Sequence, residues 1–276
     1  MTALGRVADA ALSLVAPAAA ARSATDAFSR TREAPGAPGH LLPLHARAFA
    51  VPGDARVSCG YRWGSEHAEP VAMLLHGWRS DSSSMYSLVA PLRARGFAVV
   101  AFDAPGHGSS RGDVATITEY ARAAEAVHAA LAEVRILVGH SLGAIAAAAL
   151  SRTGASIAGI VFIAPAYTLS GVLERWRPPA MRLTRQRVNG IYDELHRRNG
   201  TPVSHWDVRS LARGVRCPIL AIHDPDDPVV PFSDSEAIAA ALPQTEILPV
   251  PGRGHHAILT APEVKTAIAR FVGRIG

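Results

Sequence analysis

The chain has 276 residues, of which 49% are apolar and 18% charged, and a formal net charge of +5. This composition predicts one soluble globular unit with a substantial core. Because the positive charge comes from scattered arginines, with Lys265 as the only lysine, and no basic block or basic and aromatic stripe appears, nucleic-acid binding is not expected. No apolar run approaches the ~18 residues needed to cross a bilayer, so no membrane span is expected.

The first segment, residues 1–39, is predicted to be a helix and a linker. Apolar residues recur near helical spacing, and a run rich in proline and glycine at 35–39 ends the segment. Asp9 interrupts what would be the apolar core of a secretory signal, which favours a helix packed on the domain. Cys59 and Cys217 lie far apart, so no disulfide framework is expected. We therefore expect a cytoplasmic protein, with secretion as the alternative.

An extended pattern begins after this segment. Residues 44–51 and 55–63 alternate apolar and polar side chains around the turn sequence 52–54, which predicts a hairpin at the edge of a sheet. Residues 71–75 carry no polar side chain, as in a central strand covered on both faces. This strand runs into His76-Gly77-Trp78, where a glycine permits close backbone approach. The amide N–H of Trp78 is a candidate donor to an oxyanion.

Helices and strands then alternate along the chain. We expect helices at 82–95 and 118–133 and strands at 97–102 and 134–138, which predicts a mostly parallel sheet covered by helices. In the loop after the predicted strand at 97–102, Asp103 and His107 are interpreted as residues that stabilise a turn.

The sequence Gly139-His140-Ser141-Leu142-Gly143 lies between a predicted strand and an alanine-rich helix. A serine at so sharp a turn has a strained backbone, and glycines two residues before and after it avoid collisions with the strand and the helix. Ser141 is therefore the candidate nucleophile. The amide N–H of Leu142, at the start of the helix, is the other candidate oxyanion donor.

A strand at 157–163 is followed by a stretch without strand patterns, residues 167–213. This insertion is too long for an ordinary connection and is predicted to form a helical cap, so the α/β core comprises 40–166 and 214–276. Its arginines either bind an anionic substrate or form a solvated outer face. We expect the substrate to contact Trp78, His140, Tyr167, Leu173, Trp176, Met181 and Tyr192.

The last strands, at 217–223 and 246–250, each precede a chemically active side chain. The first is followed by Asp224, Asp226 and Asp227, and the second by His255 and His256. An amphipathic helix at 262–272 ends the chain. Ser, Asp and His therefore occur in that order.

These segments together resemble the α/β-hydrolase family from about Val57 to the C-terminus. The matching motifs are His-Gly-Trp at 76–78, Asp-x-Pro-Gly-x-Gly-x-Ser at 103–110, Gly-His-Ser-Leu-Gly at 139–143, Asp-Pro-Val-Val-Pro at 227–231 and Gly-x-Gly-His at 252–255. Within the family, the chain resembles bacterial members of unassigned specificity, in which an N-terminal helix precedes the sheet and a Tyr-x-Trp-Gly strand, here at 61–64, precedes the oxyanion strand.

The resemblance implies an α/β fold with a mostly parallel central sheet flanked by helices, and a role for each motif residue. Ser141 corresponds to the nucleophile, His255 to the general base and acid, and Asp227 to the residue that orients the imidazole, with Asp224 and Asp226 as alternatives. The implied reaction is hydrolysis of a small-molecule carboxylic ester or thioester through an acyl-enzyme, with no metal or organic cofactor. The alternatives are cleavage of C–C or amide bonds by the same residues and a binding protein without catalysis.

Overall fold

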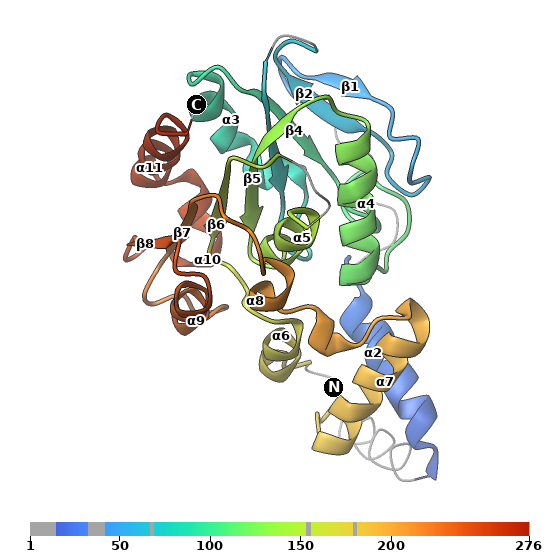
Figure 1. Ribbon diagram of the computed structural model, residues 1–276. Helices are drawn as coiled ribbons and strands as arrows, with labels where there is room; N and C mark the ends of the chain where they lie inside the picture. The colour runs from blue at the N-terminus through green and yellow to red at the C-terminus, as the bar shows by residue number, and fades with distance from the viewer. Residues whose placement is uncertain (1–14, 33–41, 67–68, 153–155, 179–180, 276) are drawn as a thin grey trace.

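An eight-stranded sheet forms the centre of the computed structural model, which describes residues 15–32, 42–66, 69–152, 156–178 and 181–275 (Figure 1). The strand order is β1-β2-β4-β3-β5-β6-β7-β8, and all pairings from β4 to β8 are parallel. The predicted mostly parallel sheet is thus confirmed. The strands are β1 Arg47–Phe49, β2 Gly60–Trp63, β3 Val71–Leu75, β4 Ala98–Phe102, β5 Val134–His140, β6 Gly159–Ile163, β7 Ile219–His223 and β8 Thr245–Pro249.

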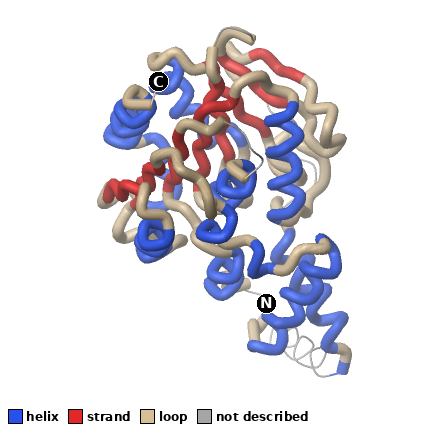
Figure 2. The backbone as a smooth tube through the Cα atoms, viewed as in Figure 1, coloured by secondary structure: helices blue, strands red, loops and turns tan. Residues whose placement is uncertain are grey.

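Helices cover both faces of this sheet (Figure 2). Val71, Met73 and Leu75 of β3 face a core shared with α4 and α5, whereas Ala72 and Leu74 face a second core shared with α3 and α11. No helix in the ranges given above is long and apolar enough to cross a membrane. The helices are α2 Pro17–Ser29, α3 Val89–Arg93, α4 Ile117–Ala129, α5 Gly143–Leu150, α6 Leu169–Arg175, α7 Arg185–Asn199, α8 Val208–Leu211, α9 Ser233–Ala241, α10 Gly254–Ala257 and α11 Pro262–Val272, with short 3₁₀ turns at Ser82–Leu88, Val203–His205 and Ile258–Thr260.

The predicted edge hairpin is present but shorter than expected. Strands β1 and β2 pair antiparallel, and β2 pairs antiparallel with β4. Residues 50–59 form a loop in place of the predicted strand ends, because their polar groups bond elsewhere. The Arg56 guanidinium pairs with Glu119, and Ser58 Oγ donates to the carbonyl of Ser109 at 2.6 Å.

The single helix predicted at 82–95 is also wrong in detail. The segment forms a 3₁₀ turn over Ser82–Leu88 and then the short helix α3. Pro91 lies in the first turn of α3, where its missing amide hydrogen leaves no helical hydrogen bond unmade.

The N-terminal helix α2 packs on α7 of the predicted cap, and the two lie side by side at the bottom of Figure 1. A Cβ at Gly190 would lie 2.7 Å from Ala21 Cβ, so the glycine permits the close approach. The Phe28 and Trp176 rings meet edge to face, with centroids 5.2 Å apart. Of the apolar residues near helical spacing in segment 1–39, Val15 is 86% exposed. Leu4, Val7, Ala11 and Leu14 lie outside the described residues.

The backbone after α2 is tied to loop 104–114 of the core. Thr31 N donates to the Asp113 carbonyl at 2.9 Å. The Arg32 guanidinium donates to three carbonyl oxygens of the same loop, those of Gly106, Gly108 and Ser110, at 2.6 to 2.8 Å. The N-terminal segment therefore connects α2, α6 and α7, which we call the helical layer, to a core loop.

Candidate active site

The serine of the Gly-x-Ser-x-Gly sequence lies at a strained turn between β5 and α5. Ser141 has φ of 54°, a conformation that side chains rarely adopt. A Cβ at Gly139 would lie 2.6 Å from the Gly143 carbonyl oxygen, and a Cβ at Gly143 would lie 2.3 Å from that of Leu75. The predicted reason for both glycines is confirmed, because any side chain at either position would collide with backbone.

We expect Gly143→Ala to destabilise the fold strongly. The added methyl group meets two backbone carbonyls, of Leu75 and His76, which cannot move without shifting β3. The free energy of unfolding should fall by at least about 2 kcal/mol, the upper range for overpacking. Urea unfolding measures this value. Gly96→Ala, with nothing within 4 Å of the added Cβ but with φ of +82°, is the control for backbone strain without a collision.

A chain of hydrogen bonds joins Ser141 to a histidine and a carboxylate from distant segments. The His255 ring comes from α10, with Nε2 3.0 Å from Ser141 Oγ and Nδ1 2.7 Å from Asp227 Oδ2. Since the carboxylate accepts from Nδ1–H, Nε2 is left to accept the serine proton. Asp227 Oδ1 accepts from the amides of Val229 and Val230 at 2.7 and 3.0 Å. The loops after β5, β7 and β8 thus meet at the carboxyl edge of the sheet.

A second histidine, His223, contacts the same carboxylate oxygen of Asp227. It is fully buried at the end of β7, with Nε2 3.1 Å from the Val230 carbonyl oxygen and 3.4 Å from Asp227 Oδ2. Ser235 Oγ donates to His223 Nδ1 at 2.7 Å. Burial raises the pKa of Asp227, but the hydrogen bonds from His223, His255 and the two backbone amides outweigh it and hold that pKa well below its usual value. The sequence around His223 indicates only an apolar strand, so it does not predict this contact with Asp227.

The two alternative aspartates have other positions. Asp224 is 1% exposed, and its carboxylate accepts from the amides of Arg253, at 2.6 Å, and Gly254. It therefore holds the loop that carries His255. Asp226 is exposed. Of the three carboxylates, only Asp227 bonds to the His255 ring.

His140 was expected to contact substrate, but the structure places it behind His255. It is 1% exposed, and its Nε2 donates to the His255 carbonyl at 2.9 Å. Burial, and after it the neighbouring His255, lower the pKa of His140 to about 3, so the ring is neutral at physiological pH. His256 is exposed and its ring packs against that of His255. Within the described ranges, no three potential ligand side chains converge to hold a metal ion.

The two candidate oxyanion donors flank the serine turn. A Cβ at Gly77 would lie 3.2 Å from Ser141 Cβ, so the loop carrying Trp78 packs directly on the turn. Leu142 is the N-cap residue of α5. Among the hydrogen bonds of the described residues, none uses the amide N–H of Trp78 or Leu142. Both N–H groups are therefore available to an oxygen at the site.

The interpretation of Asp103 and His107 as turn residues is confirmed. Asp103 accepts from the amides of Ser82 and Ser109, each at 2.8 Å. His107 Nδ1 lies 3.0 Å from the Pro105 carbonyl oxygen. Burial raises the pKa of Asp103, but the amide donors and nearby His76 hold it below its ordinary value of 3.8.

We expect stability to fall in acid because Asp103 is charged in the folded protein. A carboxyl with a lowered folded pKa stabilises the protein above its unfolded pKa, and this contribution disappears as pH falls from about 4 towards the folded value. Urea unfolding of wild type and Asp103→Asn at pH 6 and 3.5 measures it. The variant should be less stable than wild type at pH 6, with a smaller difference at pH 3.5. An equal difference at both pH values would contradict the expectation.

Of the predicted substrate contacts, only Trp78 lines a cavity at this site, together with the predicted oxyanion donor Leu142. A narrow cavity of about 30 Å³ lies between the core and the helical layer, bordered by Trp78 and Leu142. The other predicted cap contacts do not line it. Leu173 is fully buried, and the remaining ones are partly buried and pack on the main core: Tyr167, Trp176, Met181 and Tyr192. The lining includes Ser29 of α2, which no sequence pattern connects with the site.

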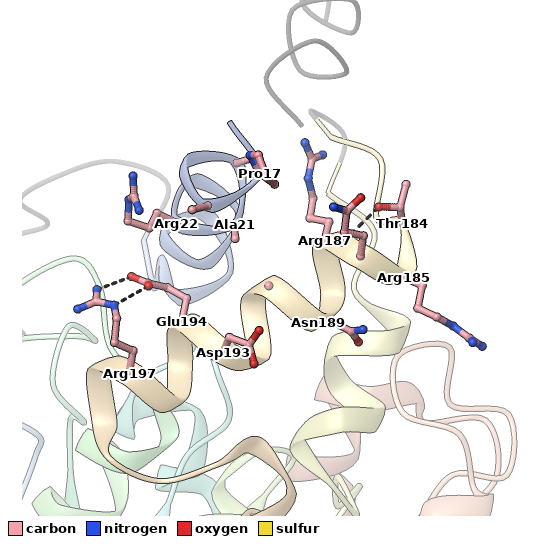
Figure 3. A pocket seen from close by; sticks show the side chains of 14 residues that line it. Pro17, Ala21, Arg22, Thr184, Arg185, Arg187, Asn189, Asp193, Glu194 and Arg197 are labelled. Carbon is pink, nitrogen blue, oxygen red and sulfur yellow. Dashed lines mark hydrogen bonds and ion pairs between the residues drawn. The ribbon is translucent and has the colours of Figure 1, made fainter. Parts of the chain in front are cut away.

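Several cap arginines are bound within the protein. Arg175 pairs with Asp234 at 2.9 Å, and Arg198 pairs with Glu194 and Asp26, each at 2.7 Å. A larger groove of about 730 Å³ lies between α2 and α7 (Figure 3), where Arg197 pairs with Glu194. None of the residues around this groove belongs to the Ser141 site. These pairings favour a structural role for the arginines over anion binding.

Comparisons with known proteins agree with this arrangement. A model of the alpha/beta hydrolase family matches residues 72–267. A serine hydrolase-like protein of Danio rerio is 43% identical over 51 residues, which cover 18% of this chain and 15% of that protein. An esterase from Pyrococcus furiosus has the same fold, with a TM-score of 0.65 and 18% identity over 88% of this chain and 99% of that one. A monoacylglycerol lipase from Paleococcus ferrophilus aligns with a TM-score of 0.54 and 22% identity, over 78% and 97% of the two chains. The family match covers most of the sheet and every motif at its edge, and the chain therefore belongs to the alpha/beta hydrolase family of enzymes.

Proposed function

We propose that the protein is a serine hydrolase that cleaves carboxylic esters or thioesters of small molecules through an acyl-enzyme intermediate. The observation that carries this proposal is the hydrogen-bonded chain from Ser141 Oγ through His255 to Asp227, with distances of 3.0 and 2.7 Å. Nucleophile, base and orienting carboxylate within hydrogen-bond reach are the arrangement that serine acyl transfer requires.

The geometry suggests two chemical steps. His255 Nε2 takes the proton of Ser141 as Oγ attacks the carbonyl carbon, and the amides of Trp78 and Leu142 donate to the oxyanion. The protonated ring then gives its proton to the leaving alcohol or thiol. Water, deprotonated by the same nitrogen, attacks the acyl carbon, and the ring returns this proton to Ser141 Oγ as the bond to the acyl group breaks and the acid is released. Asp227 stabilises the ring cation throughout, and neutral His140 adds no second positive charge next to it.

A fluorophosphonate probe tests this function directly, because it reacts with an activated serine. We expect stoichiometric labelling of the native protein, with the modified peptide containing Ser141, and no labelling after boiling. Labelling of a serine other than Ser141, or no labelling of the native protein, would reject the proposal. A panel of esters, thioesters and amides with one acyl group then identifies the bond that is cleaved.

A further inference from the structure

The cavity beside Trp78 and Leu142 is small. Its volume of about 30 Å³ has room for about two water-sized groups, since one water needs roughly 10–15 Å³ by this measure. Apolar side chains form most of its wall, among them Ile117, Leu169 and Val172. A group of two or three non-hydrogen atoms fits here, and a long alkyl chain does not.

Two residues that line this cavity each carry a buried polar atom without a partner among the described residues. Ser29 is 3% exposed, and its Oγ makes no hydrogen bond in the part of the chain that the structure describes. Trp78 Nε1 is likewise buried without an acceptor. Buried polar atoms in proteins are almost always paired, and an indole N–H can only donate. By contrast, Thr116 Oγ1 donates to Asn199 Oδ1 at 2.9 Å, so these two residues of the lining satisfy each other.

We propose that this cavity binds the acyl group of the substrate, and that the preferred acyl group is short and carries a hydrogen-bond acceptor oxygen near the carbonyl. This inference rests on the proposed serine hydrolase function. When the carbonyl oxygen accepts from the amides of Trp78 and Leu142, the acyl chain leaves the carbonyl carbon beside the side chains of the same two residues. An ether or hydroxyl oxygen on that chain then accepts from Ser29 Oγ–H and Trp78 Nε1–H.

The first experiment compares three p-nitrophenyl esters with the wild-type enzyme: butyrate, methoxyacetate and octanoate. The first two acyl groups have the same number of non-hydrogen atoms, and methoxyacetate replaces one methylene with oxygen. Each kcat/KM is divided by the hydroxide-catalysed rate of that ester to remove intrinsic reactivity. We expect methoxyacetate to exceed butyrate by about fivefold, the effect of one net hydrogen bond. Octanoate should fall below butyrate by at least about tenfold. Octanoate turnover equal to that of butyrate would reject the short pocket.

The second experiment changes the wall of the cavity. Ser29→Ala should lower the ratio of methoxyacetate to butyrate turnover by about threefold. Ser23→Ala, exposed on the same helix, is the matched control and should leave the ratio unchanged. An equal loss for both esters with Ser29→Ala would contradict recognition of the oxygen. Thermal unfolding establishes that each variant is folded.

Val172→Ala enlarges the cavity and should raise octanoate turnover relative to butyrate by about fivefold, since longer chains then fit. Val215→Ala, a partly buried position outside the cavity, is its control. An unchanged ratio with Val172→Ala would reject the cavity as the acyl site. Fluorophosphonate labelling of Ser141 distinguishes a failure of this acyl-site inference from a failure of the proposed serine hydrolase function. Labelling with the wrong acyl profile rejects only this inference, whereas absent labelling rejects the proposed function itself.

Discussion

Replacing Ser141 with alanine is expected to lower kcat for p-nitrophenyl butyrate by at least about 10⁴-fold. The reaction loses its nucleophile, and only the oxyanion donors and substrate binding remain to accelerate attack by water. KM should change little, because the removed oxygen contributes to the reaction more than to binding. Steady-state kinetics with active-site-titrated wild type as the reference measures the effect.

The fold of this variant should be intact. Alanine occupies the same backbone conformation, with φ near 54°, and the hydroxyl bonds only to His255 among the described contacts. Circular dichroism and the unfolding midpoint should match those of wild type. Ser151→Ala, a partly buried serine after α5, is the matched control and should retain full activity. Turnover by Ser141→Ala within tenfold of wild type would mean that another group is the nucleophile.

Substituting each of the three clustered aspartates by asparagine is expected to separate their roles. Asp227→Asn should lower kcat by about 10⁴-fold, because an amide leaves the His255 ring in the wrong tautomer and its cation unstabilised. Asp226→Asn should be close to wild type, since this side chain is exposed. Asp224→Asn should reduce stability as well as activity, because Asp224 accepts from the amides that hold the His255 loop.

The measurements are kcat, KM and the unfolding midpoint of all three variants. Asp227→Asn should keep its midpoint within a few degrees, because asparagine Oδ1 still accepts from Val229 and Val230. Full activity of Asp227→Asn combined with inactivity of a folded Asp226→Asn would assign the orienting carboxylate to Asp226. Such a result would require the loop after β7 to rearrange in the substrate complex.

The central sheet could be predicted because its strands are apolar runs bounded by glycine, proline and polar turns. β3 and β7 have no exposed face, so β3 is continuously apolar and β7 is apolar up to its last residue, His223. The length of the edge hairpin was predicted less accurately, since Arg56 and Ser58, in the loop between β1 and β2, bond to other parts of the chain. Such tertiary hydrogen bonds leave no local periodicity. The helix predicted at 82–95 was too long, because Pro91 limits where the α-helix can begin.

The residues of the candidate site could be predicted where a motif fixes both residue type and spacing. Ser141, His255 and Asp227 meet in the structure, although their catalytic roles stay a prediction. His223 and Ser29 could not be found, because each lies in a segment whose pattern indicates only a strand or a helix. The acyl contacts predicted in the cap were chosen by residue size, and burial of Leu173 and the packing of Trp176 on Phe28 depend on how helices meet.

The attachment of α2 restricts how the helical layer can move relative to the sheet. Residues 167–213 leave and re-enter the core at their two ends, and α2 adds a third connection through Arg32 and loop 104–114. A layer fixed at three points cannot swing open about one hinge. A displacement of α7 would have to slide it along Ala21 or break the Arg32 hydrogen bonds, so the position of this helix is tied to a segment that precedes the first strand.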